Sequence, residues 1–125
     1  VGHSAGGQLA LLASSSRYVR NVVALAPICD LEKGDELELD DGAIRMYLGC
    51  DPREKPELNP IKSTVLSVPV RIIHGTLDER VPIELSRDFV RAHHEVEFLE
   101  LNNVGHFELI DPRREDLIRL VLEEN

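Results

Sequence analysis

The sequence predicts an α/β fold in which parallel strands alternate with helices. Two observations carry this prediction: three short apolar runs, and helix-like segments that separate and follow them. The runs are residues 22–26, 68–74 and 96–101. The first two are apolar almost throughout, as expected of strands buried on both faces, whereas the third alternates as a strand near a sheet edge would.

The helix-like segments can be placed in order along the chain. Residues 6–13 (GGQLALLA) follow a strand that ends at Val1 and read as the opening of a buried helix. Pro27 stops the strand at 22–26. A further helix starts near Pro82, where proline suits the first turn, and runs to about residue 93. Residues 112–124 form an amphipathic helix whose apolar side is Leu117, Ile118, Leu120, Val121 and Leu122.

Residues 29–67 do not continue the alternation of strands and helices. They are expected to leave the sheet, as a small cap over the site. Acids dominate residues 30–41, a short helix is expected over 43–48, and turn signals follow at 49–52 and 59–60. We interpret the acidic run as solvated surface. Repulsion of anionic substrates and binding of a cation remain alternatives.

Composition narrows the function classes. The chain has 125 residues and a net charge of −9, which disfavours binding to nucleic acid and to anionic membranes. It has no apolar run of bilayer length and no signal-like start, so we expect a cytoplasmic protein. Cys29 and Cys50 lack metal-type or C-x-x-C spacing and are expected to be free thiols. No histidine spacing supports a metal site, so no metal is expected.

The first six residues carry the most specific motif. Gly2-His3-Ser4-Ala5-Gly6 fits G-x-S-x-G, the strained strand-to-helix turn that presents a nucleophilic serine above a sheet. Glycine at 2 and 6 is expected because a Cβ would collide in so tight a turn. The following helix N-terminus favours developing negative charge. Ser4 is therefore the candidate nucleophile.

A serine hydroxyl needs a base to take its proton, and a carboxylate to orient that base. Asp78 follows the strand that ends at His74, and His106 follows the strand over 96–101. Each therefore stands on a loop at the carboxyl end of a strand, in the order serine, acid, histidine. Glu79 is an alternative candidate for the acid. The non-catalytic alternative for Asp78 is that it is an ordinary aspartate of a turn.

The remaining histidines read as structural. His3 occupies the variable position of the motif, His74 ends a buried strand and is expected to satisfy backbone groups, and His93 and His94 close a helix. Glu108 and Asp111 could hold the loop of His106 or start the last helix. Asp111 followed by Pro112 is adequate as a helix cap.

Together, residues 2–7, 74–82 and 105–107 resemble the C-terminal half of an α/β-hydrolase-fold serine hydrolase, of the esterase/lipase, kynurenine formamidase-like and prolyl-oligopeptidase-like group. The resemblance implies that residues 1–125 form a partial domain, from the nucleophile elbow to the C-terminal helix. It implies Ser4 as nucleophile, Asp78 as acid and His106 as base. It also implies that the Ala5 N–H is one oxyanion donor, with the second on a loop preceding the elbow.

The expected function is hydrolysis of carboxylic esters through an acyl-enzyme, without a cofactor. Amide hydrolysis of the arylformamidase or peptidase type is an alternative on the same triad. A second alternative is a non-catalytic binding protein in which the Ser4 turn is only structural. The expected partner is a small-molecule ester or amide. One edge of the strand at 22–26 is expected to be largely unpaired and to expose an apolar strand, which would favour self-association.

Overall fold

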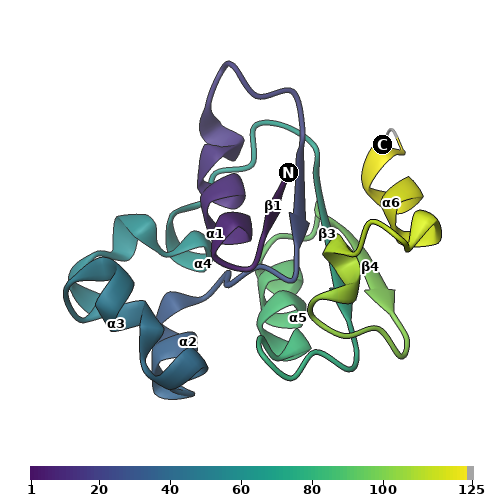
Figure 1. Cartoon of the computed structure of the whole chain (residues 1–125). Coiled ribbons are helices and arrows are strands. Elements are labelled where there is room, and N and C mark those ends of the chain that lie inside the picture. Colours follow the sequence, from purple (N-terminus) through teal and green to yellow (C-terminus); the bar gives the residue numbers. More distant parts are fainter. Residues whose placement is uncertain (124–125) are drawn as a thin grey trace.

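A computed structural model describes residues 1–123 and shows a four-stranded sheet in which every pair of neighbouring strands is parallel (Figure 1). The strands lie in sequence order: β1 (Gly2–His3), β2 (Val22–Leu25), β3 (Val70–Gly75) and β4 (Glu97–Leu101). Helices separate them along the chain. The α/β class predicted from the apolar runs is confirmed, with β4 as the expected edge strand.

Helices cover both faces of the sheet because alternate strand residues point to opposite sides. Val22 and Ala24 of β2 pack in one apolar cluster with residues of α1 (Ala5–Leu12) and α5 (Ile83–Ala92). Val23 and Leu25 pack in a second cluster with α6 (Glu115–Leu122). The buried Arg71 of β3 fastens α6 to the sheet by donating to the Leu120 carbonyl oxygen at 2.7 Å. Two 3-10 turns, η1 (Ala13–Ser15) and η5 (Glu108–Ile110), complete these connections.

The segment between β2 and β3 leaves the sheet, as predicted. It holds three short helices, α2 (Leu31–Glu36), α3 (Ala43–Leu48) and α4 (Pro60–Ser63). Three 3-10 turns join them: η2 (Leu39–Asp41), η3 (Pro52–Glu54) and η4 (Pro56–Leu58). In Figure 1, α2 and α3 lie below and to the left of the strands. We call residues 29–67 the excursion.

Ion pairs organise the acidic run of the excursion, which is therefore more than solvated surface. The Arg45 guanidinium donates two hydrogen bonds to the Asp35 carboxylate, each 2.9 Å long. Arg53 reaches Glu36 at 3.0 Å and Asp51 at 3.1 Å. These guanidinium groups link α2 to α3 and to η3.

Two helix predictions were wrong in detail. Helix α1 is buried on one side only, and Leu9 on its other side is 52% exposed. Helix α6 begins at Glu115 rather than at residue 112. The Asp111 carboxylate accepts a hydrogen bond from the Arg113 N–H at 2.9 Å, so residues 111–114 form a turn before the helix.

The expected strand edge is only partly open. The first strand was expected to end at Val1, but β1 runs over Gly2–His3. These two residues pair with Ala24 and Leu25, which covers the C-terminal half of that edge of β2. The expectation that an apolar strand would be exposed was wrong, because Val22 and Val23 are 2% and 5% exposed. Their side chains project into the two faces of the sheet that helices cover. The open part of the edge therefore exposes only backbone N–H and C=O groups.

Cys29 and Cys50 are both free thiols. No helix within residues 1–123 is long and apolar enough to cross a membrane.

Candidate active site

Ser4 occupies a strained turn between β1 and α1. Its backbone has φ 58° and ψ −116°, which a non-glycine residue adopts only when its surroundings enforce it. The Ser4 N–H donates to the Leu25 carbonyl oxygen at 2.9 Å, and the Ser4 carbonyl oxygen accepts from the Ile28 N–H at 3.2 Å. The neighbouring strand β2 and the chain that follows it thus hold the strained residue on both sides.

Glycines allow this turn to close, but not all of those predicted. A Cβ on Gly2 would lie 1.9 Å from the Gly6 carbonyl oxygen, so position 2 requires glycine. A Cβ on Gly7 would lie 2.7 Å from the Pro27 Cβ. The steric reason expected at Gly6 was wrong, since within residues 1–123 a Cβ there meets nothing within 4 Å. The second tight position is Gly7, where α1 crosses the end of β2.

The loops after β3 and β4 pack directly on each other. The Thr76 N–H donates to the Leu101 carbonyl oxygen at 2.9 Å, and the Leu77 N–H donates to the Val104 carbonyl oxygen at 3.0 Å. A Cβ on Gly75 would lie 2.0 Å from that Val104 oxygen. Glycine therefore permits the close approach that brings the loop of Asp78 to the loop of His106.

Asp78 and His106 meet at this junction, although 28 residues separate them. The fully buried Asp78 carboxylate accepts a 2.6 Å hydrogen bond on Oδ2 from His106 Nδ1. Its Oδ1 accepts from the N–H groups of Arg80 at 2.9 Å and Val81 at 2.8 Å.

Burial alone would raise the pKa of Asp78, but the hydrogen bonds from His106, His74 and Val81 N–H outweigh it and hold the pKa well below the ordinary 3.8. Asp78 is therefore ionised at neutral pH. Because an ionised carboxylate only accepts, the proton of the neutral His106 ring belongs on Nδ1, and Nε2 is free to take a proton.

His3 connects the serine turn to the histidine loop. His3 Nε2 donates to the His106 carbonyl oxygen at 2.9 Å, and the two ring centres lie 4.4 Å apart. Burial lowers the pKa of His3 below its ordinary value of 6.5. Ser4 is thus one residue from a group that touches His106, although within residues 1–123 no hydrogen bond joins its hydroxyl to the His106 ring.

Two residues that sequence reasoning treated as supporting take part in this network. His74 Nε2 lies 3.2 Å from Asp78 Oδ2, besides its contact with the Val81 carbonyl oxygen at 2.8 Å. A usable signal existed, because His74 stands at the carboxyl end of β3, the strand that leads into the Asp78 loop. Glu108 accepts from the Gly105 N–H at 3.1 Å and pairs with Arg114, so it holds the histidine loop.

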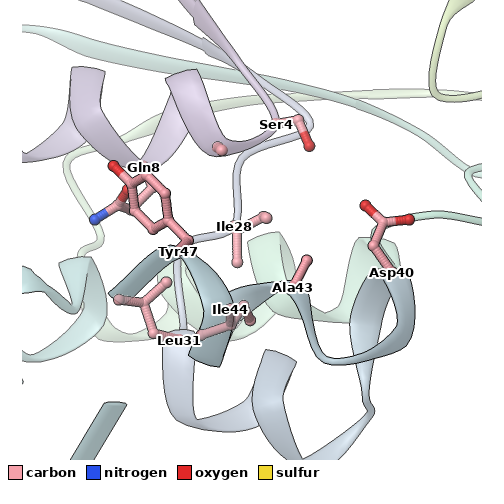
Figure 2. A pocket seen from close by; sticks show the side chains of 9 residues that line it. Ser4, Gln8, Ile28, Leu31, Asp40, Ala43, Ile44 and Tyr47 are labelled. Atoms are coloured by element: carbon pink, nitrogen blue, oxygen red, sulfur yellow. The ribbon is translucent and has the colours of Figure 1, made fainter. Parts of the chain in front are cut away.

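A pocket of about 230 Å³ opens beside Ser4 (Figure 2). Most of its wall is apolar, and most of that wall comes from the excursion and the chain leading into it. Figure 2 shows Tyr47 and Gln8 on one side and the Asp40 carboxylate on the other. The lining residues are Ser4, Ala5, Gln8, Ile28, Leu31, Asp40, Ala43, Ile44 and Tyr47. The excursion thus shapes the space that a group attached to Ser4 would occupy.

The Ala5 N–H stands at the first position of α1, where no earlier helical carbonyl can accept it. Among residues 1–123 it donates to no other group, so it is free to bind an oxyanion formed at Ser4. Among the same residues, no three or more histidine, cysteine or acidic side chains gather as a possible metal site.

Solved structures with the same arrangement reveal the fold. A puromycin hydrolase mutant complexed with PGG superposes with a TM-score of 0.74 at 23% identity, over 97% of this chain and 20% of that chain. The chain has the α/β-hydrolase fold. A thermophilic esterase from Thermogutta terrifontis with propionate bound gives a TM-score of 0.66 at 23% identity, over 96% of this chain and 50% of that chain.

A third α/β-hydrolase, the monoacylglycerol lipase of Paleococcus ferrophilus, gives a TM-score of 0.65 at 18% identity, over 96% of this chain and 64% of that chain. The chain thus spans between a fifth and about two thirds of the length of these three neighbours. No protein-family model and no curated protein sequence matches it.

Proposed function

We propose that this chain carries the serine, histidine and aspartate of a hydrolase that cleaves carboxylic esters through an acyl-enzyme. The proposal rests on one observation: three loops meet at the carboxyl ends of the strands. The strained Ser4 turn, the His106 loop and the Asp78 loop are joined there by the His3–His106 and His106–Asp78 hydrogen bonds.

Each residue has a defined role in the proposed reaction. Ser4 Oγ attacks the ester carbonyl carbon while its proton passes to His106 Nε2. The Ala5 N–H donates to the resulting oxyanion. The His106 imidazolium then gives its proton to the departing alkoxide, leaving an acyl group on Ser4. A water molecule then attacks the acyl carbon while His106 takes its proton. His106 returns that proton to Ser4 Oγ as the bond between Oγ and the acyl carbon breaks, and the carboxylic acid leaves.

Asp78 supports both halves of this cycle without accepting the proton itself. Its carboxylate fixes the Nδ1–H tautomer of His106 and stabilises the imidazolium formed in each attack. The four donors around Asp78 keep it ionised, which suits this role.

The pocket beside Ser4 favours an ester with a small, uncharged acyl group. Its volume of about 230 Å³ and its largely apolar lining suit a short hydrocarbon group. Esters and amides share the acyl-enzyme route, so formamide or peptide-type amide hydrolysis is the second candidate. The names of the neighbours support both, since they include two ester-cleaving enzymes and a puromycin hydrolase.

Replacement of the serine tests the proposal. In the full-length protein, Ser4→Ala is expected to lower turnover of short-chain aryl esters by ~10⁴- to 10⁶-fold, the cost of losing one member of comparable triads. The melting temperature should hold, because alanine keeps the Cβ. Near-normal turnover by the alanine variant would disprove an acyl-enzyme on Ser4. A parallel assay with aryl formamides and aminoacyl amides decides between the two substrate classes.

Two expectations from the sequence stay predictions. They are the cytoplasmic location and self-association through the open part of the β2 edge.

A further inference from the structure

A second histidine touches the carboxylate that orients His106. His74 is fully buried at the end of β3, and its Nε2 lies 3.2 Å from Asp78 Oδ2. The same carboxylate oxygen takes the 2.6 Å hydrogen bond from His106 Nδ1. Asp78 Oδ2 is therefore shared between two imidazole rings.

The surroundings of His74 settle which nitrogen carries its proton. Nε2 faces the Val81 carbonyl oxygen at 2.8 Å and the Asp78 carboxylate, neither of which has a proton to give. Nε2 must therefore be protonated, and its single proton is shared between the Val81 carbonyl oxygen, which is the nearer acceptor, and Asp78 Oδ2. Nδ1 lies 2.7 Å from the Ser86 hydroxyl of α5, which can donate to it. Ser86 thus fixes the tautomer from the opposite side of the ring.

We infer that His74 is a positioning residue for the reaction, which holds Asp78 ionised and aimed at His106 through its Nε2–H, with Ser86 fixing its tautomer. This inference rests on the proposed function. Asp78 Oδ1 is already held by two backbone N–H groups, so His74 supplies the only side-chain donor to the carboxylate besides His106 among residues 1–123. Without His74, Oδ2 depends on His106 alone.

The variants His74→Leu and His74→Gln, in the full-length protein, separate positioning from packing. Leucine fills the buried space but cannot donate, whereas the glutamine amide can restore a donor near the Nε2 position. A hydrogen bond to a charged group has a net value that corresponds to about a 10- to 100-fold rate change. We expect His74→Leu to lose that much in kcat with KM unchanged, and His74→Gln to recover most of the loss.

The pH profile supplies a readout that a packing defect would not move. In His74→Leu the Asp78 carboxylate loses one donor, so its charge acts more strongly on His106. That charge stabilises the protonated, imidazolium form of the His106 ring. The acidic limb of the kcat/KM profile should therefore move to higher pH in His74→Leu, by roughly one pH unit. Within residues 1–123, the other titratable groups with electrostatic contact to His74 or His106 are His3, Asp78 and Glu100, and all are kept in these variants.

Titration of active sites with a serine-reactive phosphonate corrects kcat for any unfolded fraction. Should His74→Leu fail to fold, Ser86→Ala decides, with an expected loss of about three- to tenfold in kcat and the same direction of limb shift. His93→Leu is the matched control, since His93 caps the C-terminal end of α5 and stacks on Phe89. It should leave kcat and the pH profile unchanged.

An unchanged acidic limb, or equal losses in His74→Leu and His74→Gln, would overturn the inference. Failure of the proposed function is distinguishable, because it would appear as a wild-type protein whose Ser4 the phosphonate does not label. Failure of the inference alone would appear as normal labelling with wild-type kcat and pH profile in His74→Leu and Ser86→Ala.

Discussion

The loops at the sheet edge and the excursion are built in different ways. The loops of Asp78 and His106 are held by buried hydrogen bonds and by backbone contact at Gly75. The excursion relies in addition on ion pairs whose arginines are about half exposed, with 53% of the Arg45 side chain and 42% of the Arg53 side chain open to solvent. Its turn at residues 38–42 adds left-handed backbone at Glu38, Asp40, Asp41 and Gly42.

The difference indicates separate roles for the two regions, proton transfer for the loops and substrate recognition for the excursion. Proton transfer tolerates little misplacement, and the groups proposed for it lie where burial fixes them. Recognition of a substrate can vary more, and the pocket wall comes mainly from the excursion. One ion pair connects the two regions, between Arg80 beside Asp78 and Asp40 at the pocket, at 3.2 Å. The Arg80 guanidinium also lies over the Phe107 ring, next to His106.

The largest expected effect in the sheet-edge loops comes from Asp78→Asn. An asparagine can donate to His106 Nδ1 and so favour the wrong tautomer, in which Nε2 carries the proton and cannot serve as base. By analogy with comparable triads, kcat should fall ~10⁴-fold. Steady-state kinetics on the full-length protein measure this loss. A decrease of less than tenfold would show that Asp78 does not orient the base, and Glu79→Gln then tests the rival acid.

A smaller effect is expected from Gly75→Ala, which tests the close approach of the two loops. Its Cβ would overlap the Val104 carbonyl oxygen, so the loops must move apart, at a cost of about 1–3 kcal/mol in unfolding free energy. Gly105→Ala is the control, because its nearest contact, with Glu108 Oε1, is an ordinary 3.5 Å. Denaturant unfolding measures both. Equal stability of the two variants would contradict the role given to Gly75.

The smallest effect is expected in the excursion, from Arg53→Ala. Exposed ion pairs contribute little and are screened by salt, so the melting temperature should fall by roughly one to three degrees at low salt. The difference from wild type should shrink at high salt. Thermal unfolding at two salt concentrations provides the measurement. A large loss that persists at high salt would mean that the excursion is held as firmly as the loops.

The strands and the loops of Asp78 and His106 could be predicted from the sequence better than the excursion, for a physical reason. Strands buried on both faces leave continuous apolar runs, and the chemistry of a strained serine turn needs glycine at position 2. Local pattern therefore located β2, β3, β4 and the loops after them. The pattern places His74 at the carboxyl end of β3, but its 3.2 Å contact with Asp78 depends on how the following loop folds back. The steric role of Gly7 arises only when α1 packs against Pro27, so no local pattern contains it. The ion pairs of the excursion likewise depend on which arginine reaches which acid.

Covalent labelling of the full-length protein with a serine-reactive fluorophosphonate, followed by peptide mass spectrometry, tests directly whether Ser4 is the nucleophile. We expect one modified residue, Ser4, with loss of ester turnover in proportion to labelling. We also expect that His106→Ala slows labelling by orders of magnitude while leaving the fold intact. Labelling of another serine, or labelling of Ser4 at an undiminished rate in His106→Ala, would contradict the assembly of Ser4, His106 and Asp78 into one catalytic unit.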